Sequence, residues 1–445
     1  MTERVHKKRR LSSFQIIIMG FAGLILAGTL LLMLPVASRS RAVTPFNETL
    51  FTATSAVCVT GLVVRDTASY WSAFGQAVIL VLIQIGGLGV VTVAVAFALL
   101  SGRKISLMQR SAMQDSISAP KVGGIVRLTG FVLKVTFILE SIGALAMLPV
   151  FVSRHGAKGV WMAFFHSVSA FCNAGFDVMG TDSAKYVSLT SFSSQPVVIV
   201  TLMLLIIIGG IGFMTWDDVA VNRFHFKKYR LQSKIILASA GILIVVPAIF
   251  FFLFDFSGLP LKERILTSLF HSITPRTAGF NTIEVTSMSG AGKAITVALM
   301  LIGGSPGSTA GGMKTTTVAV LFANLFASFR RKEDAELFGR RIEPKAVKTA
   351  ATILVMYVTL AVAGALIIST AEGLPVSSCL FETASAVGTV GLTMGITPEL
   401  GVLSQCVLMV LMFFGRVGGL TLIYAALSGP NKNLSKYPQE KITVG

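Results

Sequence analysis

The chain has 445 residues, of which 53% are hydrophobic and only 13% are charged, with a formal net charge of +18. A soluble protein carries about twice that charged fraction. Uncharged runs such as 11–38 and 67–102 exceed the roughly 20 apolar residues that cross a bilayer. The composition therefore excludes a soluble globular domain and predicts an integral membrane protein. The four cysteines show no disulfide or metal-ligand spacing.

Most basic residues lie in short clusters between the apolar runs. Together these clusters hold 24 of the 38 Lys and Arg residues, at 4–10, 103–121, 223–234, 330–348 and 432–441, whereas the alternate loops hold nine. An excess of Lys and Arg marks the cytoplasmic side of a membrane. We therefore expect a multi-pass protein of the cell membrane with both termini in the cytoplasm. The alternation disfavours the other interpretation of the charge, a nucleic-acid-binding surface. The first apolar run is too long for a signal peptide and predicts the first span.

A short motif ending in glycine occurs four times along the chain. The copies are 55–62 (SAVCVTGL), 169–176 (SAFCNAGF), 273–280 (ITPRTAGF) and 385–392 (SAVGTVGL), and their glycines are 114, 104 and 112 residues apart. A phenylalanine stands ten residues before the glycine in three copies, and nine before it in the third. The second copy is followed by about ten extra residues around 177–194. The chain is therefore built from internal repeats.

Every copy has the same frame: a long apolar span, a loop, a half-apolar segment, the motif and a second span with a glycine pair. The half-apolar segment is too short to cross the bilayer, so we expect it to enter and return on one side. The predicted fold is an all-α integral membrane protein with eight transmembrane helices and four re-entrant pore helices around one central pore. The predicted repeats are 1–124, 125–230, 231–345 and 346–445.

Four equivalent re-entrant loops around one axis are typical of a cation filter, in which rings of backbone carbonyls replace the hydration shell. Glycine permits the backbone conformations that this needs, and the preceding helix directs the negative end of its dipole at the cation. The candidate filter residues, through their carbonyls, are Val59, Thr60, Gly61, Asn173, Ala174, Gly175, Thr277, Ala278, Gly279, Thr389, Val390 and Gly391. Arg276 lies just before the third filter segment; we favour structural pairing with loop carbonyls over direct repulsion of the ion.

The second span of the third copy is interrupted by a glycine-rich segment, 303–312. Its five glycines and one proline would cost an ideal helix on the order of 8 kcal/mol, so we expect an unwound loop inside the pore rather than a cytoplasmic linker. The candidate gating residues are this loop and two basic residues inside spans: Gly303, Gly304, Ser305, Pro306, Gly307, Ser308, Thr309, Ala310, Gly311, Gly312, Lys314 and Arg416. Arg416 could hold the loop through its carbonyls. Lys134 and Glu140 are interpreted as structural.

This arrangement resembles the superfamily of potassium transporters that includes the Trk, Ktr and plant HKT proteins, and most closely a bacterial KtrB-type subunit. The resemblance covers nearly the whole chain and rests on four degenerate relatives of the TVGYG filter, at 59–61, 173–175, 277–279 and 389–391. No copy carries the tyrosine and second glycine of that filter, so we expect weaker discrimination between ions.

The resemblance implies potassium uptake through a channel-like pore, with potassium bound at the filter and no cofactor bound by this chain. It also implies an intramembrane gate at 303–312, a homodimer in membrane lipid, and a separate cytoplasmic ring of nucleotide-binding (regulator of potassium conductance) subunits. In this family a serine in place of the first-repeat glycine is associated with sodium permeation, so Gly61 favours potassium.

Several alternatives stay open at this point. The chain could be a sodium-permeable member of the same family, or a symporter of sodium and potassium, with sodium as an activator. A secondary carrier with an alternating-access site is disfavoured, because such carriers commonly use inverted repeats. A membrane-embedded enzyme is disfavoured because no catalytic constellation and no phosphate-binding loop are found in the sequence.

Overall fold

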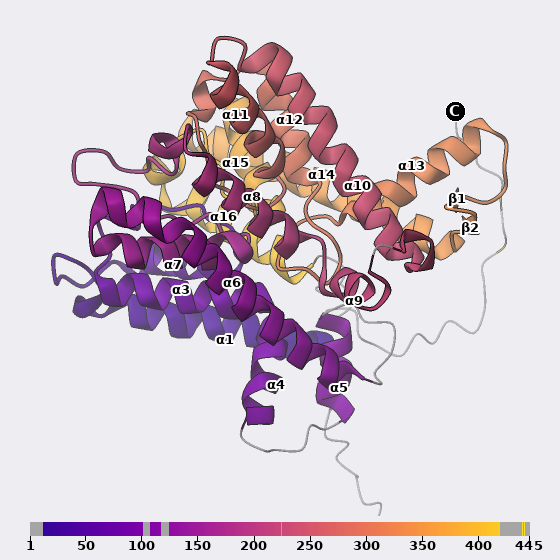
Figure 1. The fold of residues 1–445 in the computed structure, drawn as a ribbon, viewed down its shortest axis with the longest axis horizontal. Helices are drawn as coiled ribbons and strands as arrows, with labels where there is room; N and C mark the ends of the chain where they lie inside the picture. The colour runs from indigo at the N-terminus through magenta and orange to yellow at the C-terminus, as the bar shows by residue number, and fades with distance from the viewer. Residues whose placement is uncertain are drawn as a thin grey trace, which may run out of the picture.

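The computed structural model describes residues 12–100, 107–116, 124–223 and 225–418, with the single residues 438 and 440. Nearly all regular structure in this part of the chain is helical (Figure 1), which confirms the predicted fold class. The terminal basic clusters at 4–10 and 432–441 lie outside the described residues, apart from Glu440 and the isolated residue 438.

Four long helices are apolar enough to cross a membrane: α1 (Ser13–Met33), α6 (Ile125–His155), α10 (Leu231–Phe250) with its π-helical continuation Phe251–Asp255, and α14 (Pro344–Glu372). They are the predicted first spans of the four copies. The start of α1 is fixed by a capping box, in which the Ser12 hydroxyl accepts from the Gln15 amide and the Gln15 side chain accepts from the Ser12 amide. Helix α14 has no such capping bond. It begins with Pro344, whose fixed backbone suits the first turn and which has no N–H group left without a partner.

A shorter helix follows each long one and packs back against it. These four helices, called the pore helices here, are α2 (Phe46–Val57), α7 (Lys158–Phe171), α11 (Leu261–Ile273) and α15 (Val376–Gly388). The phenylalanine that precedes each motif lies on these helices and is at most 2% exposed: Phe51, Phe165, Phe270 and Phe381. Burial of these rings anchors each pore helix in the protein interior.

The second span is broken rather than continuous in each of the first three copies. In the first two copies α3 (Ala73–Leu88) meets α4 (Val90–Leu100), and α8 (Pro196–Gly210) meets α9 (Phe213–Asn222), both at 97°. The breaks occur at Gly89 and Gly212, whose φ angles of +87° and +91° are accessible to glycine. The sequence predicted an unwound segment only in the third copy, so these two bends correct the expected straight spans.

In the third copy α12 (Gly290–Leu301) and α13 (Thr315–Phe329) are separated by the glycine-rich segment, and in the fourth α16 (Val402–Val417) ends at Gly418. By length and composition the described residues hold four spanning helices, or up to six if each bent pair counts as one. The total of eight spans therefore stays a prediction.

The copies follow one another around a circle. Each second span packs against the pore helix of the next copy: α3 on α7, α8 on α11, and α12 on α15. The last one, α16, packs on α2 of the first copy, which closes the circle. Each pore helix therefore packs between the first span of its own copy and the second span of the preceding copy.

The remaining elements are short. Helix α5 (Leu107–Ser116) lies beside α4, and the antiparallel hairpin of β1 (Glu336–Leu337) and β2 (Arg340–Arg341) follows α13 (Figure 1). Single turns of 3-10 helix occur at Pro35–Ala37, Thr190–Phe192, Phe226–Lys228, Val285–Ser287 and Thr397–Glu399. The predicted repeat boundaries at 124/125 and 230/231 fall at the starts of α6 and α10, whereas 345/346 falls inside the first turn of α14.

Candidate ion pore

The four motifs have the same alternating backbone. The residue two before each glycine has a left-handed φ between +52° and +75° although it carries a side chain: Val59, Asn173, Thr277 and Thr389. The glycines themselves have φ between +68° and +96°. A left-handed conformation at a residue other than glycine costs on the order of 1–3 kcal/mol. It recurs here at one position in all four copies, so the surrounding structure must impose it.

The four glycines pack in a closed ring. A Cβ atom at Gly61 would lie 2.5 Å from the Ala174 carbonyl oxygen, and one at Gly175 would lie 2.7 Å from that of Ala278. The ring continues in the same way, with 2.2 Å from Gly279 to Val390 and 2.2 Å from Gly391 to Thr60. Each glycine thus leaves room for a carbonyl of the next copy, and all twelve predicted filter residues belong to one site.

Hydroxyl groups of the pore helices hold the motifs from behind. The Gly61 amide donates to the Ser55 hydroxyl at 3.1 Å, and the Gly391 amide donates to that of Ser385 at 3.0 Å. In the other two copies a hydroxyl donates instead to the carbonyl after the glycine, from Ser169 to Phe176 and from Thr274 to Phe280. Each motif is therefore held in position by hydrogen bonds within its own copy.

Arg276 differs from the expectation in its contacts. Its side chain is half-buried, and its Nε has no hydrogen-bond partner within the part of the chain that the structure describes. No bond from Arg276 to a loop carbonyl is found among those residues. The favoured structural pairing therefore lacks a contact here, and the alternative of ion repulsion stays open.

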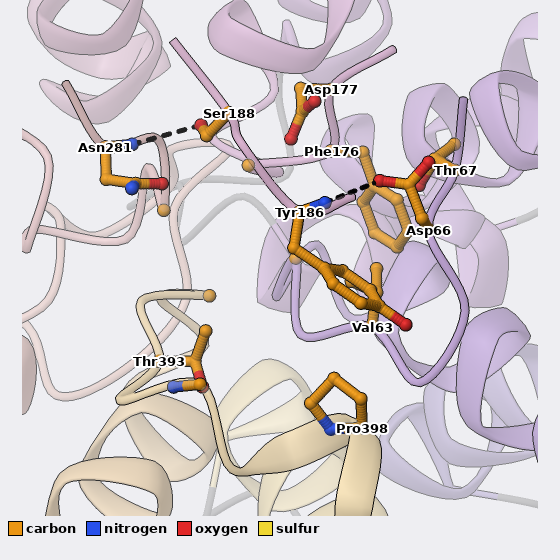
Figure 2. A pocket seen from close by; sticks show the side chains of 15 residues that line it. Val63, Asp66, Thr67, Phe176, Asp177, Tyr186, Ser188, Asn281, Thr393 and Pro398 are labelled. Atoms are coloured by element: carbon orange, nitrogen blue, oxygen red, sulfur yellow. Dashed lines mark hydrogen bonds between the residues drawn. The ribbon is translucent and has the colours of Figure 1, made fainter. Parts of the chain in front are cut away.

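A cavity of about 100 Å³ lies over one side of the glycine ring and is called the outer cavity here. Figure 2 shows its polar lining, in which Asp66, Asp177 and Tyr186 come from the first two copies, and Asn281 and Thr393 from the last two. The extra residues of the second copy fold across this opening. The Tyr186 amide donates to Asp66 Oδ2 at 2.9 Å, and the Asn281 amide donates to the Ser188 hydroxyl at 3.2 Å.

The two carboxyl groups at this opening, those of Asp66 and Asp177, differ in their burial and hydrogen bonds. Asp66 is buried and already accepts from the Ser69 amide, the Ser69 hydroxyl and the Tyr186 amide. Asp177 is half-buried and accepts from the Met179 amide at 3.0 Å. Burial, with a contribution from Asp66, raises the pKa of Asp177 to about 7. Asp177 is therefore the carboxyl group at this opening whose charge changes near neutral pH.

On the other side of the ring lies the glycine-rich loop, defined as residues 303–312. Its ends are joined, since Ile302 and Met313 form a β-bridge and the Thr315 amide donates to the Gly304 carbonyl at 3.0 Å. The Thr309 hydroxyl donates to the Phe171 carbonyl at 3.0 Å and accepts from the Asn173 side chain at 2.8 Å. The loop thus lies directly against a pore-helix terminus and a candidate filter residue.

The two basic residues predicted beside this loop both contact it. Lys314 Nζ donates to the carbonyls of Ala310 at 2.9 Å and Gly311 at 3.1 Å. Arg416 donates to the Thr309 carbonyl and, through its other terminal nitrogen, to the carbonyls of Gly86 and Gly87, the latter at 2.9 Å. One guanidinium therefore connects the fourth copy, the loop of the third and the broken span of the first.

Further anchors of the loop were missed by the sequence analysis. The amides of Ser305 and Thr309 donate to the carbonyls of Gly210 and Gly209, and the Gly312 amide donates to that of Gly415. The glycine pairs of the second spans were noted only as repeat marks, yet they supply these bonds. Glu382 was missed as well: it accepts from Thr393, Met394 and Thr397 and fixes the segment after the fourth motif.

Lys134 and Glu140 both lie on α6. Lys134 is exposed, whereas Glu140 is only 3% exposed and accepts from the Gln84 amide group at 3.4 Å. The Glu140 backbone carbonyl accepts from the Ser167 hydroxyl of a pore helix at 2.6 Å. The Glu140 contacts join α6 to the neighbouring helices of the first two copies.

Apolar spans surrounding four pore helices, whose ends converge on a ring of left-handed glycines, define a multi-pass membrane transport protein. The family model for TrkH, described as a cation transport protein, matches residues 2–437. The chain belongs to the TrkH family of cation transport proteins. Members of this family are membrane ion transporters, so the predicted family is confirmed and the chain is not an enzyme.

The chain is similar to several characterised relatives over its full length. It is 41% identical to the potassium/sodium uptake protein NtpJ of Enterococcus hirae, with 100% of this chain and 99% of that protein covered. It is 35% identical to the Ktr system potassium uptake protein B of Bacillus subtilis, with the same coverage. The structure of the potassium transporter TrkH from Vibrio parahaemolyticus has the same fold, with a TM-score of 0.73 over 95% of this chain and 86% of that chain at 19% identity.

Proposed function

We propose that this chain is the pore subunit of a potassium-uptake system and that potassium is bound by the backbone carbonyls of the four motifs. The ring of twelve residues defined above is the selectivity filter, and the outer cavity is its external opening. The ion leaves the filter towards the glycine-rich loop, which blocks the path in the arrangement described. The basic loops face the cytoplasm and so do both termini.

The observation that carries this proposal is the backbone of the motifs. In all four copies a residue with positive φ is followed by one without and then by a glycine with positive φ, an alternation that turns successive carbonyls to one side. Oxygen rings of this kind replace the water around a potassium ion. Four helix carboxyl ends, each carrying partial negative charge, point at the same place. A cation is therefore stabilised there without any charged side chain in the ring.

The chain works with other subunits in this proposal. Three relatives carry names that assign them to a Ktr system, which supports a separate regulatory partner. We place a ring of nucleotide-binding subunits on the cytoplasmic loops and a second copy of the pore beside the first. The helix that follows the glycine-rich loop, α13, transmits the motion of that ring to the loop.

A sodium-permeable pore is the second candidate. The name of the relative at 41% identity includes sodium as well as potassium. The four motifs lack the tyrosine and second glycine of the TVGYG filter of potassium channels. Fewer carbonyl rings are then left to discriminate between the two ions. Gly61 in the first copy favours potassium over this candidate.

Uptake in cells tests both candidates. We expect the chain, expressed with a nucleotide-binding partner in a bacterium that lacks its own potassium uptake, to restore growth at low potassium. Purified protein in liposomes should carry potassium faster than sodium when each is supplied alone. Equal sodium and potassium fluxes would favour the second candidate, and no flux of either ion would contradict the proposal.

External pH should affect uptake through Asp177. Its carboxylate is charged above a pKa of about 7 and neutral below it, so attraction of cations is present at pH 8 and lost towards pH 6. A single charge at the mouth changes the energy of a cation by on the order of 1 kcal/mol, about a fivefold change in occupancy. At potassium concentrations below saturation we expect uptake to rise about fivefold over this interval, and Asp177→Asn to remove the rise.

Asp182→Asn is the matched control, because Asp182 is on the same loop but is exposed and does not line the outer cavity. It removes the same charge and should keep the pH dependence. If Asp177→Asn and Asp182→Asn have the same pH profile, Asp177 does not attract the cation.

A further inference from the structure

An apolar groove lies between α10 and α13, on the helix that follows the glycine-rich loop. Its volume is about 450 Å³. Each helix contributes a stripe of residues at helical spacing. The stripe on α10 is Ile235, Ala238, Ser239, Ile242 and Leu243, and the stripe on α13 is Thr315, Val318, Ala319, Phe322, Ala323 and Phe326. Apolar stripes that face each other normally pack together. Here the small residues at the centre of both stripes leave the space open.

Charged side chains lie at one end of this groove. A second cavity of about 310 Å³ shares Ala323, Phe326 and Leu337 with the groove and adds Arg330, Lys332, Asp334 and Glu336. Lys332 is paired with Glu336 at 2.9 Å, whereas Arg330 is exposed and makes no ion pair in the described part of the chain. The surrounding segment 330–348 contains seven basic and four acidic residues. Asp334 is paired with Arg341, so within the described residues Arg330 is the lining charge that has no ion pair. The apolar groove therefore opens directly beside an unpaired arginine.

The β1–β2 hairpin closes this end of the groove by a strained turn. Phe338 and Gly339 form the turn, with φ angles of +50° and +72°. Both central positions of such a turn favour asparagine or glycine, and a bulky side chain with positive φ is unusual. Phe338 nevertheless lines the groove and is 49% exposed. The strained conformation holds the Phe338 ring between the apolar groove and the charged residues at its end.

We propose that the groove binds an acyl chain of an anionic phospholipid, whose phosphate lies at Arg330. An acyl chain fits the apolar stripes, and a phosphate group supplies the negatively charged partner that Arg330 lacks. A neutral lipid fits the groove but brings no net negative charge to Arg330. A second copy of the chain would have to bring its own acidic group to Arg330.

The bound lipid acts on the glycine-rich loop through the start of α13. Thr315 lines the groove, and its hydroxyl lies 3.2 Å from that of Ser305 in the loop. The Thr315 amide also donates to the Gly304 carbonyl. A lipid that fills the space between α10 and α13 holds the first turn of α13 in this arrangement, and therefore holds the loop across the pore. Anionic lipid then lowers flux in the absence of a partner.

Two measurements on the full chain test this inference. The chain is reconstituted into vesicles of phosphatidylcholine alone or with about one-quarter phosphatidylglycerol, and potassium flux is measured without partner. In parallel, the number of phosphatidylglycerol molecules retained by the purified protein is counted by native mass spectrometry. We expect phosphatidylglycerol to lower wild-type flux about threefold or more, and one retained lipid to be lost in Arg330→Gln together with this inhibition.

Arg331→Gln is the matched control, because Arg331 is adjacent and exposed but does not line either cavity. It should behave as wild type. Ala319→Trp fills the groove directly and should lose the retained lipid and make flux insensitive to lipid composition. Equal lipid retention in Arg330→Gln and Arg331→Gln would overturn the inference, as would a disulfide between Cys introduced at Ala319 in two copies, since a second chain would then occupy the groove.

The inference uses the proposed function only for the flux measurement. If no potassium flux is found in any vesicle but the retained lipid depends on Arg330, the lipid site stands and the proposed transport fails. If flux is found but neither flux nor retained lipid depends on Arg330, the lipid site fails alone.

Discussion

Replacing Gly279 with alanine is expected to lower potassium uptake by at least about tenfold and to reduce the preference for potassium over sodium. Two physical effects add. The backbone at Gly279 has φ of +79°, and a left-handed residue with a side chain costs on the order of 1–3 kcal/mol. The added Cβ would also lie 2.2 Å from the Val390 carbonyl oxygen. That oxygen belongs to the proposed filter, so the substitution displaces an ion ligand directly, and each 1.4 kcal/mol of lost stabilisation is a factor of ten.

Gly241→Ala is the control for this experiment. Gly241 lies in α10, and a Cβ atom there would meet nothing within 4 Å. Both variants are compared with wild type by potassium and sodium flux in liposomes, after equal amounts of folded protein have been confirmed. Wild-type flux and selectivity in Gly279→Ala would show that this ring is not the filter.

The repeat and its anchors could be predicted because they depend on local sequence. The motif glycines, the phenylalanine before each of them and the length of the pore helices recur along the chain, and a conformation restricted to glycine can be inferred from one residue type. The third copy's loop was likewise predictable, since its glycines and proline make a helix there costly.

The breaks in the other second spans could not be predicted in the same way. A pair of glycines within an apolar run is tolerated in a membrane helix, and the approach of the span is decided by a contact with the pore helix of its own copy. A Cβ atom at Gly86 would lie 2.1 Å from the Val57 carbonyl oxygen, and one at Gly209 would lie 2.1 Å from that of Phe171. These glycines allow the second span to approach the end of a pore helix, which no local pattern reveals.

The extra residues of the second copy were visible in the sequence, but their position was not. They reach Asp66 and Asn281, which are 120 and 93 residues from their partners in the loop. Side-chain bonds over such separations depend on the circular order of the copies. Arg276 shows the converse: its place directly before the third motif's candidate filter residues could be read from the sequence, while its expected partners are not found among the described residues.

The glycine-rich loop is connected to every copy of the repeat. It donates to the second spans of the second and fourth copies, lies against Asn173 of the second, and reaches the first through Arg416. A Cβ atom at Gly311 would lie 2.1 Å from Thr389 Oγ1 of the fourth motif. The loop therefore lies against the proposed filter on the side opposite the outer cavity, and movement of the loop requires several of these bonds to break together.

Arg416→Ala is expected to raise potassium flux without partner by roughly tenfold. The guanidinium makes charge-assisted hydrogen bonds to the Thr309 carbonyl and to the first copy. A bond to a charged group contributes about 1.5–3 kcal/mol, so its loss shifts the balance between blocking and open positions of the loop by about one to two powers of ten. Arg416→Lys keeps the charge but not the two-pronged geometry, and it should lie between alanine and wild type if the connection between copies matters.

Shortening the loop within 305–311 is expected to have the larger effect, because it removes the block itself rather than one of its anchors. Flux should rise above that of Arg416→Ala and become independent of the nucleotide-binding partner. The filter is left in place, so the ratio of potassium to sodium flux should change little, although Asn173 loses its bond to Thr309. Thr309→Ala removes that bond while the loop keeps its length, and it measures this contribution separately. If the shortened protein folds and inserts but conducts no faster than wild type, the loop does not block the pore.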